Sequence, residues 1–169
     1  EYGINEKLAR QLQDSEYGDL FETIVKETDV PSTFVAATLT ETLKSLKREG
    51  FEIERLSKEQ IIGAFRLVGS GRTSKEAISE IFKWLSRHEG ADPEEAIKEL
   101  GLAMLSKHEL QRIVKELVEQ NRRLIFERGE RAFGPLMGMI MKKYRGRVDA
   151  RMVSALIKEE ISRYSGDVN

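Results

Sequence analysis

Apolar residues recur along this chain every three or four positions, and the strict alternation typical of a strand is absent. Leu8 and Leu12 form one such pair, and Leu20, Phe21 and Ile24 continue the spacing in the next segment. A helix with this period turns one apolar stripe toward a core and leaves its other face to solvent. The pattern predicts an all-α protein of about nine helices.

Helix boundaries are marked by capping residues and by glycines. Ser57 and Ser106 each stand three residues before a Gln or Glu, which is the spacing of a capping box, and Asp92-Pro93 is a further helix start. Expected helices therefore begin after Ser57, near Thr73 or Ser74, after Asp92 and after Ser106. The others are expected at 4–13, 17–27, 33–48, 122–127, 130–144 and 149–164.

The helices fall into two groups, with a seam near Gly101 to Ser106. We expect a helical bundle at 29–104 followed by a smaller helical tail domain at 105–169. The chain does not begin with Met, so we expect it to be a fragment or processed form. It has no cysteine, no signal peptide and no apolar run of the ~20 residues that span a bilayer, so we expect a cytoplasmic protein without membrane contact.

Positive charge gathers in the C-terminal part of the chain. Residues 121–151 hold nine Lys and Arg and three acidic residues, a net charge of +6, whereas the whole chain carries −1. An asymmetry of this kind is typical of a segment that binds a polyanion.

Catalytic chemistry has no clear candidate. His88 and His108 lie on different expected helices, no Cys stands near them, and the carboxylates are interspersed with Lys and Arg. We therefore expect neither a metal site nor an active site in this chain. The loop at 69–75 lacks the spacing of a phosphate-binding loop and is best interpreted as a helix stop and start. Its Lys75 would still stand at a helix N-terminus, where one phosphate could bind.

The strongest cluster is a run of four cations around a turn at Gly146, namely Lys142, Lys143, Arg145 and Arg147. Cations at a helix end complement the helix dipole, which explains two of them but not four. Lys and Arg in such a cluster give salt-dependent contacts to phosphates. Arg122 and Arg123 extend the candidate RNA-binding set on grounds of charge alone.

Two glycines precede this cluster. Gly134 and Gly138 are four residues apart on one expected helix, a spacing that predicts close approach of another helix backbone.

The sequence from Phe133 to Lys142, followed by Gly146, resembles the GxLxGxxMK…G tail pattern of tRNA-dependent amidotransferases. This family includes the B subunit of the bacterial enzyme, the E subunit of the archaeal enzyme and small YqeY-like proteins. Residues 71–76 resemble a second family stretch before a helix, and residues 34–44 resemble the archaeal E subunit more than the bacterial B subunit. Residues 1–5 resemble the segment that links the catalytic domain to the tail.

The resemblance implies a parent enzyme that converts Glu-tRNA(Gln) to Gln-tRNA(Gln), using ATP, Mg²⁺ and ammonia from an asparaginase-like partner, the D subunit. Residues 1–28 would then be linker helices from a catalytic domain that this chain lacks, and the chain itself would need no cofactor. The tail would hold tRNA(Gln) through Lys142, Lys143, Arg145 and Arg147, with Lys75 next. The alternative is a protein-interaction module that docks on a partner protein without contacting RNA.

Overall fold

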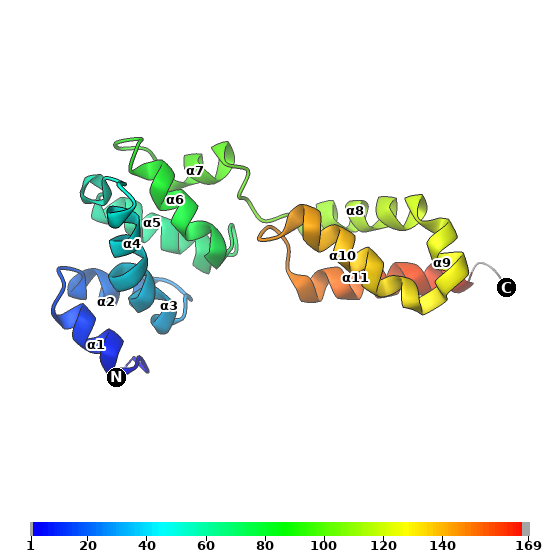
Figure 1. The fold of residues 1–169 in the computed structure, drawn as a ribbon, viewed down its shortest axis with the longest axis horizontal. Coiled ribbons are helices and arrows are strands. Elements are labelled where there is room, and N and C mark those ends of the chain that lie inside the picture. The colour runs from blue at the N-terminus through cyan, green and yellow to red at the C-terminus, as the bar shows by residue number, and fades with distance from the viewer. Residues whose placement is uncertain (1, 167–169) are drawn as a thin grey trace. The chain divides into compact units, whose positions relative to one another are not determined.

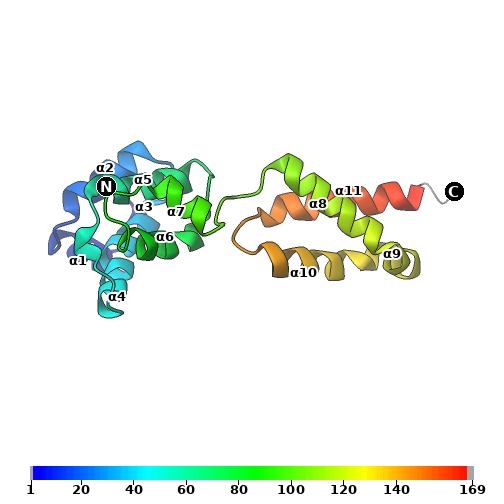
Figure 2. The ribbon, with the colours of Figure 1, turned by 90° about the horizontal axis from the view of Figure 1, so that it is seen from above.

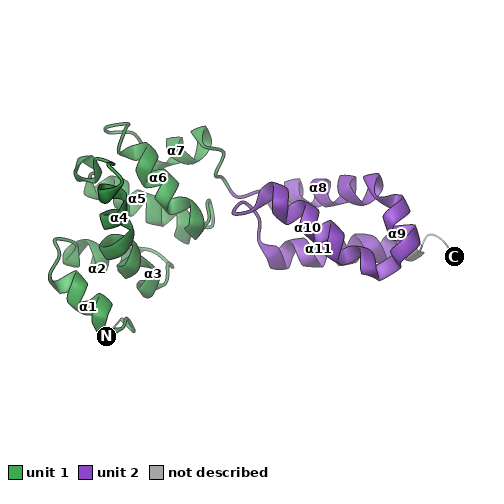
Figure 3. Cartoon of the chain, viewed as in Figure 1, with its two compact units in different colours: residues 1–103 green, residues 104–169 purple. Residues whose placement is uncertain are grey.

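The computed structural model of the chain describes residues 2–166, and every regular element in that range is helical. Figure 1 shows the helices in chain order, which confirms the predicted all-α class. Glu1, part of the predicted linker, and residues 167–169 of the predicted tail domain lie outside the described range. The chain forms two compact units, residues 1–103 and residues 104–169 (Figure 3).

Unit 1 contains seven α-helices in its described part, joined by short turns of other helix types. They are α1 (Glu6–Gln13), α2 (Gly18–Glu27), α3 (Ser32–Ala37), a π turn η1 (Thr38–Thr42), α4 (Leu43–Arg48), a 3-10 turn η2 (Ile53–Arg55), α5 (Lys58–Gly69), a 3-10 turn η3 (Lys75–Ala77), α6 (Ile78–Leu85) and α7 (Pro93–Glu99). Helices α1 and α2 pack on α3 and belong to the same core as the rest of the unit.

Helix α5 contacts α2, α6 and α7 and therefore lies at the centre of unit 1. The ring of Phe65 is fully buried and meets the rings of Phe34 and Phe82 edge-on, with centroids 6.3 and 6.2 Å away. The predicted capping box opens α5, because Ser57 Oγ accepts from the Gln60 backbone N–H. The apolar stripe and the cap thus agree on where α5 begins and which side it buries.

A π turn interrupts the helix expected as one element over 33–48. The Leu43 N–H donates to Thr38 O, five residues back, and the Thr40 hydroxyl donates to Ala36 O at 2.8 Å. A threonine hydroxyl that binds a carbonyl one turn back competes with the regular backbone bonds. The wide turn leaves Thr38 and Leu39 both buried.

Unit 2 contains α8 (Lys107–Gln120), α9 (Arg122–Arg128), a 3-10 turn η4 (Gly129–Ala132), α10 (Phe133–Tyr144) and α11 (Ala150–Gly166). Helix α11 packs on both α8 and α10. Figures 1 and 2 place α9 at one end of the unit and the turn between α10 and α11 at the other. The second predicted capping box opens α8 at Ser106.

The expected close approach at Gly134 and Gly138 is wrong for this chain. A Cβ atom built on either glycine would meet no atom within 4 Å, because this side of α10 faces away from the neighbouring described helices. A close helix approach occurs instead in unit 1, where a Cβ on Gly63 would lie 3.0 Å from Pro93 Cγ. The spacing of small residues in α10 did not reveal which side of the helix is buried.

The helices in residues 2–166 are each too short or too polar to cross a bilayer.

Candidate nucleic-acid interface

The two units carry opposite net charge. Residues 1–103 contain 14 basic and 20 acidic residues, and residues 104–169 contain 14 basic and 9 acidic residues. Unit 1 is therefore at −6 and unit 2 at +5, with histidines neutral. A polyanion is attracted to the second unit and repelled by the first.

Backbone bonds fix the turn that carries the predicted cluster. Gly146 has φ +77°, a left-handed conformation that favours glycine. The Arg147 N–H donates to Tyr144 O at 2.9 Å, and the Leu105 N–H donates to Arg147 O at 2.8 Å. The turn is thereby closed on itself and attached to the segment that precedes α8.

The one carboxylate in the turn caps the next helix. Asp149 Oδ1 accepts from the Arg151 N–H at 2.8 Å and the Met152 N–H at 3.0 Å. These bonds occupy one of its oxygens with backbone donors at the start of α11. In the described chain this carboxylate forms no ion pair with Lys142, Lys143 or Arg145.

Three of the four cations around the turn are exposed. Lys142, Lys143 and Arg145 form no ion pair with any residue that the structure describes. The Lys143 ammonium lies 5.3 Å from the Tyr144 ring centroid, a cation–π distance. These three side chains are the part of the predicted cluster most available to a phosphate; we call them the basic turn.

Arg147 differs from the basic turn because it is half-buried. It lies close enough to Glu109 to help lower the pKa of that carboxyl group. The larger causes of the low Glu109 pKa are hydrogen bonds from the Ser106 backbone and hydroxyl, followed by the charge of Arg112 and then that of Arg147. The Arg147 charge therefore acts partly inside unit 2, on Glu109 at the start of α8.

Arg122 and Arg123 lie on α9, at the opposite end of unit 2 from the basic turn (Figures 1 and 2). Arg122 pairs with Glu119 and its guanidinium lies 5.5 Å from the Tyr164 ring centroid. Arg123 pairs with Glu127 at 2.8 Å. The structure does not bring these two arginines together with the basic turn, and both already have acidic partners.

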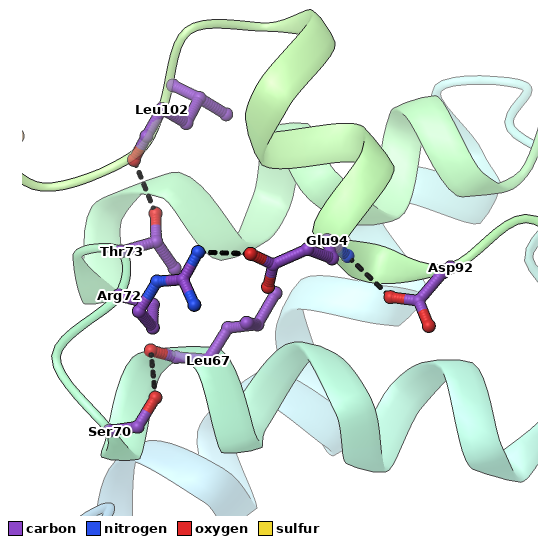
Figure 4. A network of polar contacts seen from close by, with 7 residues as sticks. All are labelled: Leu67, Ser70, Arg72, Thr73, Asp92, Glu94 and Leu102. Carbon is purple, nitrogen blue, oxygen red and sulfur yellow. Dashed lines mark hydrogen bonds and ion pairs between the residues drawn. The ribbon is translucent and has the colours of Figure 1, made fainter.

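Lys75 belongs to unit 1, at the loop between α5 and α6. Figure 4 shows how this loop is held: Arg72 pairs with Glu94, and the Thr73 hydroxyl donates to Leu102 O at 2.8 Å. Thr73 is buried, and it also forms an isolated backbone bridge with Ala103. The loop is thus a structural connection between α5, α7 and the end of unit 1.

Lys75 itself is exposed at the start of η3. Its ammonium lies 5.7 Å from the Phe34 ring centroid. No carboxylate pairs with it in the described chain, so a phosphate could approach it, whereas Arg72 is neutralised by Glu94.

Catalytic groups do not converge within the described residues. No set of three or more His, Cys, Asp or Glu residues there could hold a metal ion. His88 stacks on Trp84, with ring centroids 3.8 Å apart, and its Nδ1 lies 2.7 Å from Trp84 O. This histidine therefore covers a half-buried aromatic residue of unit 1.

Two further cations, Arg128 and Arg131, are exposed and form no ion pair in the described chain, although sequence reasoning did not select them. A signal for both was available. Arg128 has no acidic residue three or four positions away on either side, and the Glu127 that precedes Arg131 by four pairs with Arg123.

The described residues form an all-helical fold of two units, the second of them cationic. The chain belongs to the GatB domain family, whose model matches residues 19–161.

Its relatives include the E subunit of the glutamyl-tRNA(Gln) amidotransferase from three archaea. The Thermococcus gammatolerans protein is 40% identical over 165 residues, which cover 98% of this chain and 26% of the relative. The Methanosarcina acetivorans protein is 35% identical over 170 residues, covering 98% of this chain and 27% of the relative. The Methanocaldococcus jannaschii protein is 33% identical over 162 residues, which cover 95% of this chain and 26% of the relative. The chain spans about a quarter of the length of these curated relatives.

Proposed function

We propose that this chain is the tRNA-binding tail of a tRNA-dependent amidotransferase that converts Glu-tRNA(Gln) to Gln-tRNA(Gln). The observation that carries the proposal is the basic turn, whose three exposed cations have no acidic partner in the described chain. The relatives named for an enzyme that acts on glutamyl-tRNA(Gln) make tRNA(Gln) the polyanion to test.

The basic turn suits phosphate recognition rather than base reading. Its side chains are two lysines at the end of α10 and an arginine in the loop that follows, all of them cationic donors. Such contacts give affinity through counterion release and tolerate changes in sequence. The RNA would be recognised by the positions of its phosphates, and the fixed backbone of the turn would set their register.

Lys75 and Arg147 are secondary contacts in this proposal. Lys75 is exposed but lies in the acidic unit, and Arg147 is half-buried beside Glu109. Arg122 and Arg123 rank after them, because each would have to exchange a carboxylate for a phosphate.

The contribution of this chain to the reaction is orientation. Holding the body of the tRNA places its aminoacylated end at a distant site, which converts a random encounter into a positioned one. We assign ATP and Mg²⁺ to another part of the parent enzyme, because the described residues offer no fitting set of ligands, and we derive no step through either group. The ammonia would come from the asparaginase-like D subunit.

The test is to neutralise the basic turn and measure tRNA(Gln) affinity from low to high salt. The triple variant Lys142→Ala, Lys143→Ala, Arg145→Ala should bind about tenfold more weakly at physiological salt. Loss of three phosphate contacts should also reduce the slope of log affinity against log salt by about 2 to 3.

A matched control removes three exposed cations of unit 1 that form no ion pair in the described chain, Lys44, Arg48 and Lys58. This control changes the net charge by the same amount and should leave the slope nearly unchanged. Equal effects of the two triple variants would mean that net charge alone matters. If the turn variant instead binds tRNA normally and loses an asparaginase-like partner, the chain is a protein-interaction module.

A further inference from the structure

The far end of unit 2 exposes a large aromatic side chain. Phe126 on α9 is 82% exposed, against 43% for Met139, 41% for Leu100 and 37% for Met152, the other exposed large hydrophobic residues in the described chain. Ile125 beside it is buried at 4%, because one residue on a helix turns the side chain by about 100°. The Ile125 side chain therefore packs in the core of unit 2, and the Phe126 ring is exposed to solvent.

Arginines precede and follow this ring along the chain. Arg123 precedes Phe126 by three residues, so both lie on one side of α9, and the Arg123 side chain is 91% exposed. Arg128 and Arg131 follow, exposed and without an ion pair in the described chain. Residues 122–131 hold four arginines against two glutamates, so the segment is cationic overall.

A single aromatic ring among arginines fits a nucleobase better than a protein partner. Surfaces that dock proteins are usually contiguous apolar patches, whereas the other exposed large hydrophobic residues, Leu100, Met139 and Met152, lie on other elements. An unpaired base needs only one flat face to stack on, and the phosphates on either side of it need cations. Phe126 supplies such a face, and Arg128 and Arg131 follow it within five residues along the chain.

We infer that α9 and η4 form a second RNA contact, in which the Phe126 ring stacks on an unpaired nucleobase and Arg128 and Arg131 bind the flanking phosphates. The inference rests on the proposed tRNA-binding function and adds a different kind of contact to it. Helix α10 separates this contact from the basic turn by about 18 Å, for its 12 residues at about 1.5 Å each. Two contacts at that spacing fix the direction of an RNA along unit 2, which one contact cannot do.

The experiment compares Phe126→Ala, Phe126→Trp and the control Leu100→Ala in the 169-residue chain, with a tRNA(Gln) transcript as the probe. Because the Phe126 ring is exposed, neither substitution should disturb folding. Phe126→Ala should weaken binding by about 5- to 100-fold, whereas Phe126→Trp and Leu100→Ala should stay near the wild-type affinity. Stacking releases no counterions, so the salt slope of Phe126→Ala should match that of the wild type, whereas Arg128→Ala with Arg131→Ala should lower it.

A blunt RNA duplex provides the second arm, because it has no unpaired base to stack. Phe126→Ala should bind the duplex as the wild type does. Trp84 is the only tryptophan, so the variant Trp84→Phe, Phe126→Trp reports on position 126 alone. Its fluorescence should be quenched by the tRNA transcript and not by the duplex.

The outcomes separate this inference from the proposed function. If Phe126→Ala binds tRNA normally while the basic-turn variant does not, the stacking contact is wrong and the proposed function stands. If the wild-type chain binds no tRNA, both are overturned. If Phe126→Ala keeps tRNA affinity and loses a protein partner, Phe126 is a protein contact and the inference is again overturned.

Discussion

The Leu105 backbone N–H donates to the Arg147 carbonyl at 2.8 Å. This bond joins the segment before α8 to the turn between α10 and α11, so the first residues of unit 2 fix the loop that presents the basic turn. The position of Lys142, Lys143 and Arg145 thus depends on residues about 40 positions earlier in the chain. Changes in the backbone of the turn should therefore affect stability and RNA binding together.

Gly146→Ala should destabilise unit 2 by about 1 to 2 kcal/mol, because an alanine at φ +77° brings its Cβ against the backbone. It should also weaken tRNA binding, since Arg145 and Arg147 flank the glycine. Urea unfolding followed by circular dichroism measures the first effect.

The matched control is Gly138→Ala. That glycine lies inside α10 with open space around it, so alanine should stabilise the protein by about 0.5 to 1 kcal/mol. Destabilisation by Gly138→Ala would indicate that another helix does approach this side of α10.

Thr73→Val should lower the free energy of unfolding by about 1 kcal/mol. The substitution keeps the shape of a buried side chain but removes the hydroxyl that donates to Leu102 O at 2.8 Å (Figure 4). Ser70→Ala is the control, because its exposed hydroxyl donates at 3.2 Å to Leu67 O, which also accepts the Arg72 N–H. The two free energies of unfolding should differ clearly; equal values would mean that the Thr73 bond adds no stability.

The stability that Glu109 contributes should depend on pH. Hydrogen bonds from Ser106 hold the pKa of its carboxyl group below the ordinary value of 4.5. The folded form therefore favours the carboxylate, and this stabilisation is present above pH 4.5 and lost as the pH falls through the lower, folded-state pKa.

Glu109→Gln provides the comparison, because glutamine can still accept the cap hydrogen bonds but does not titrate in this range. The difference in free energy of unfolding between wild type and variant should be constant near pH 7 and should shrink below pH 4.5. A difference that stays flat down to about pH 3 would contradict the role of the Glu109 charge.

Neutralising Arg122 and Arg123 together should reduce the salt slope of tRNA binding by less than about 1, whereas each basic-turn cation should contribute about 0.7 to 0.9. The reason is that Arg122 and Arg123 are already paired with Glu119 and Glu127. A slope change as large per residue as that of the basic turn would show that the RNA displaces these carboxylates.

Local signals in the sequence were sufficient for three helix starts. The capping boxes at Ser57 and Ser106 and the Asp92-Pro93 start are confirmed, because each depends only on residues within one turn. The π turn at Thr38 to Thr42 was missed, since it depends on how side chains and backbone share acceptors within a buried helix.

The candidate site was less accessible to sequence reasoning. Counting charges grouped Arg122 and Arg123 with the residues near Gly146, although α10 places them at opposite ends of unit 2. A count of Lys and Arg also does not show which of them form ion pairs, so it treats paired and unpaired arginines alike. Phe126 was not among the selected residues, because a run of three apolar residues, Leu124 to Phe126, does not show which of them the packing of α9 leaves outside.

The division of charge between the units has a kinetic consequence. A chain at −1 overall should meet RNA slowly, yet unit 2 at +5 attracts a polyanion while unit 1 at −6 repels it. Encounters that begin at unit 1 would be short. Those that begin at unit 2 would last long enough for the RNA phosphates to align with the basic turn. The uneven charge thus favours encounters at unit 2 over encounters at unit 1 before any contact forms. Added salt screens this attraction and should therefore lower the association rate.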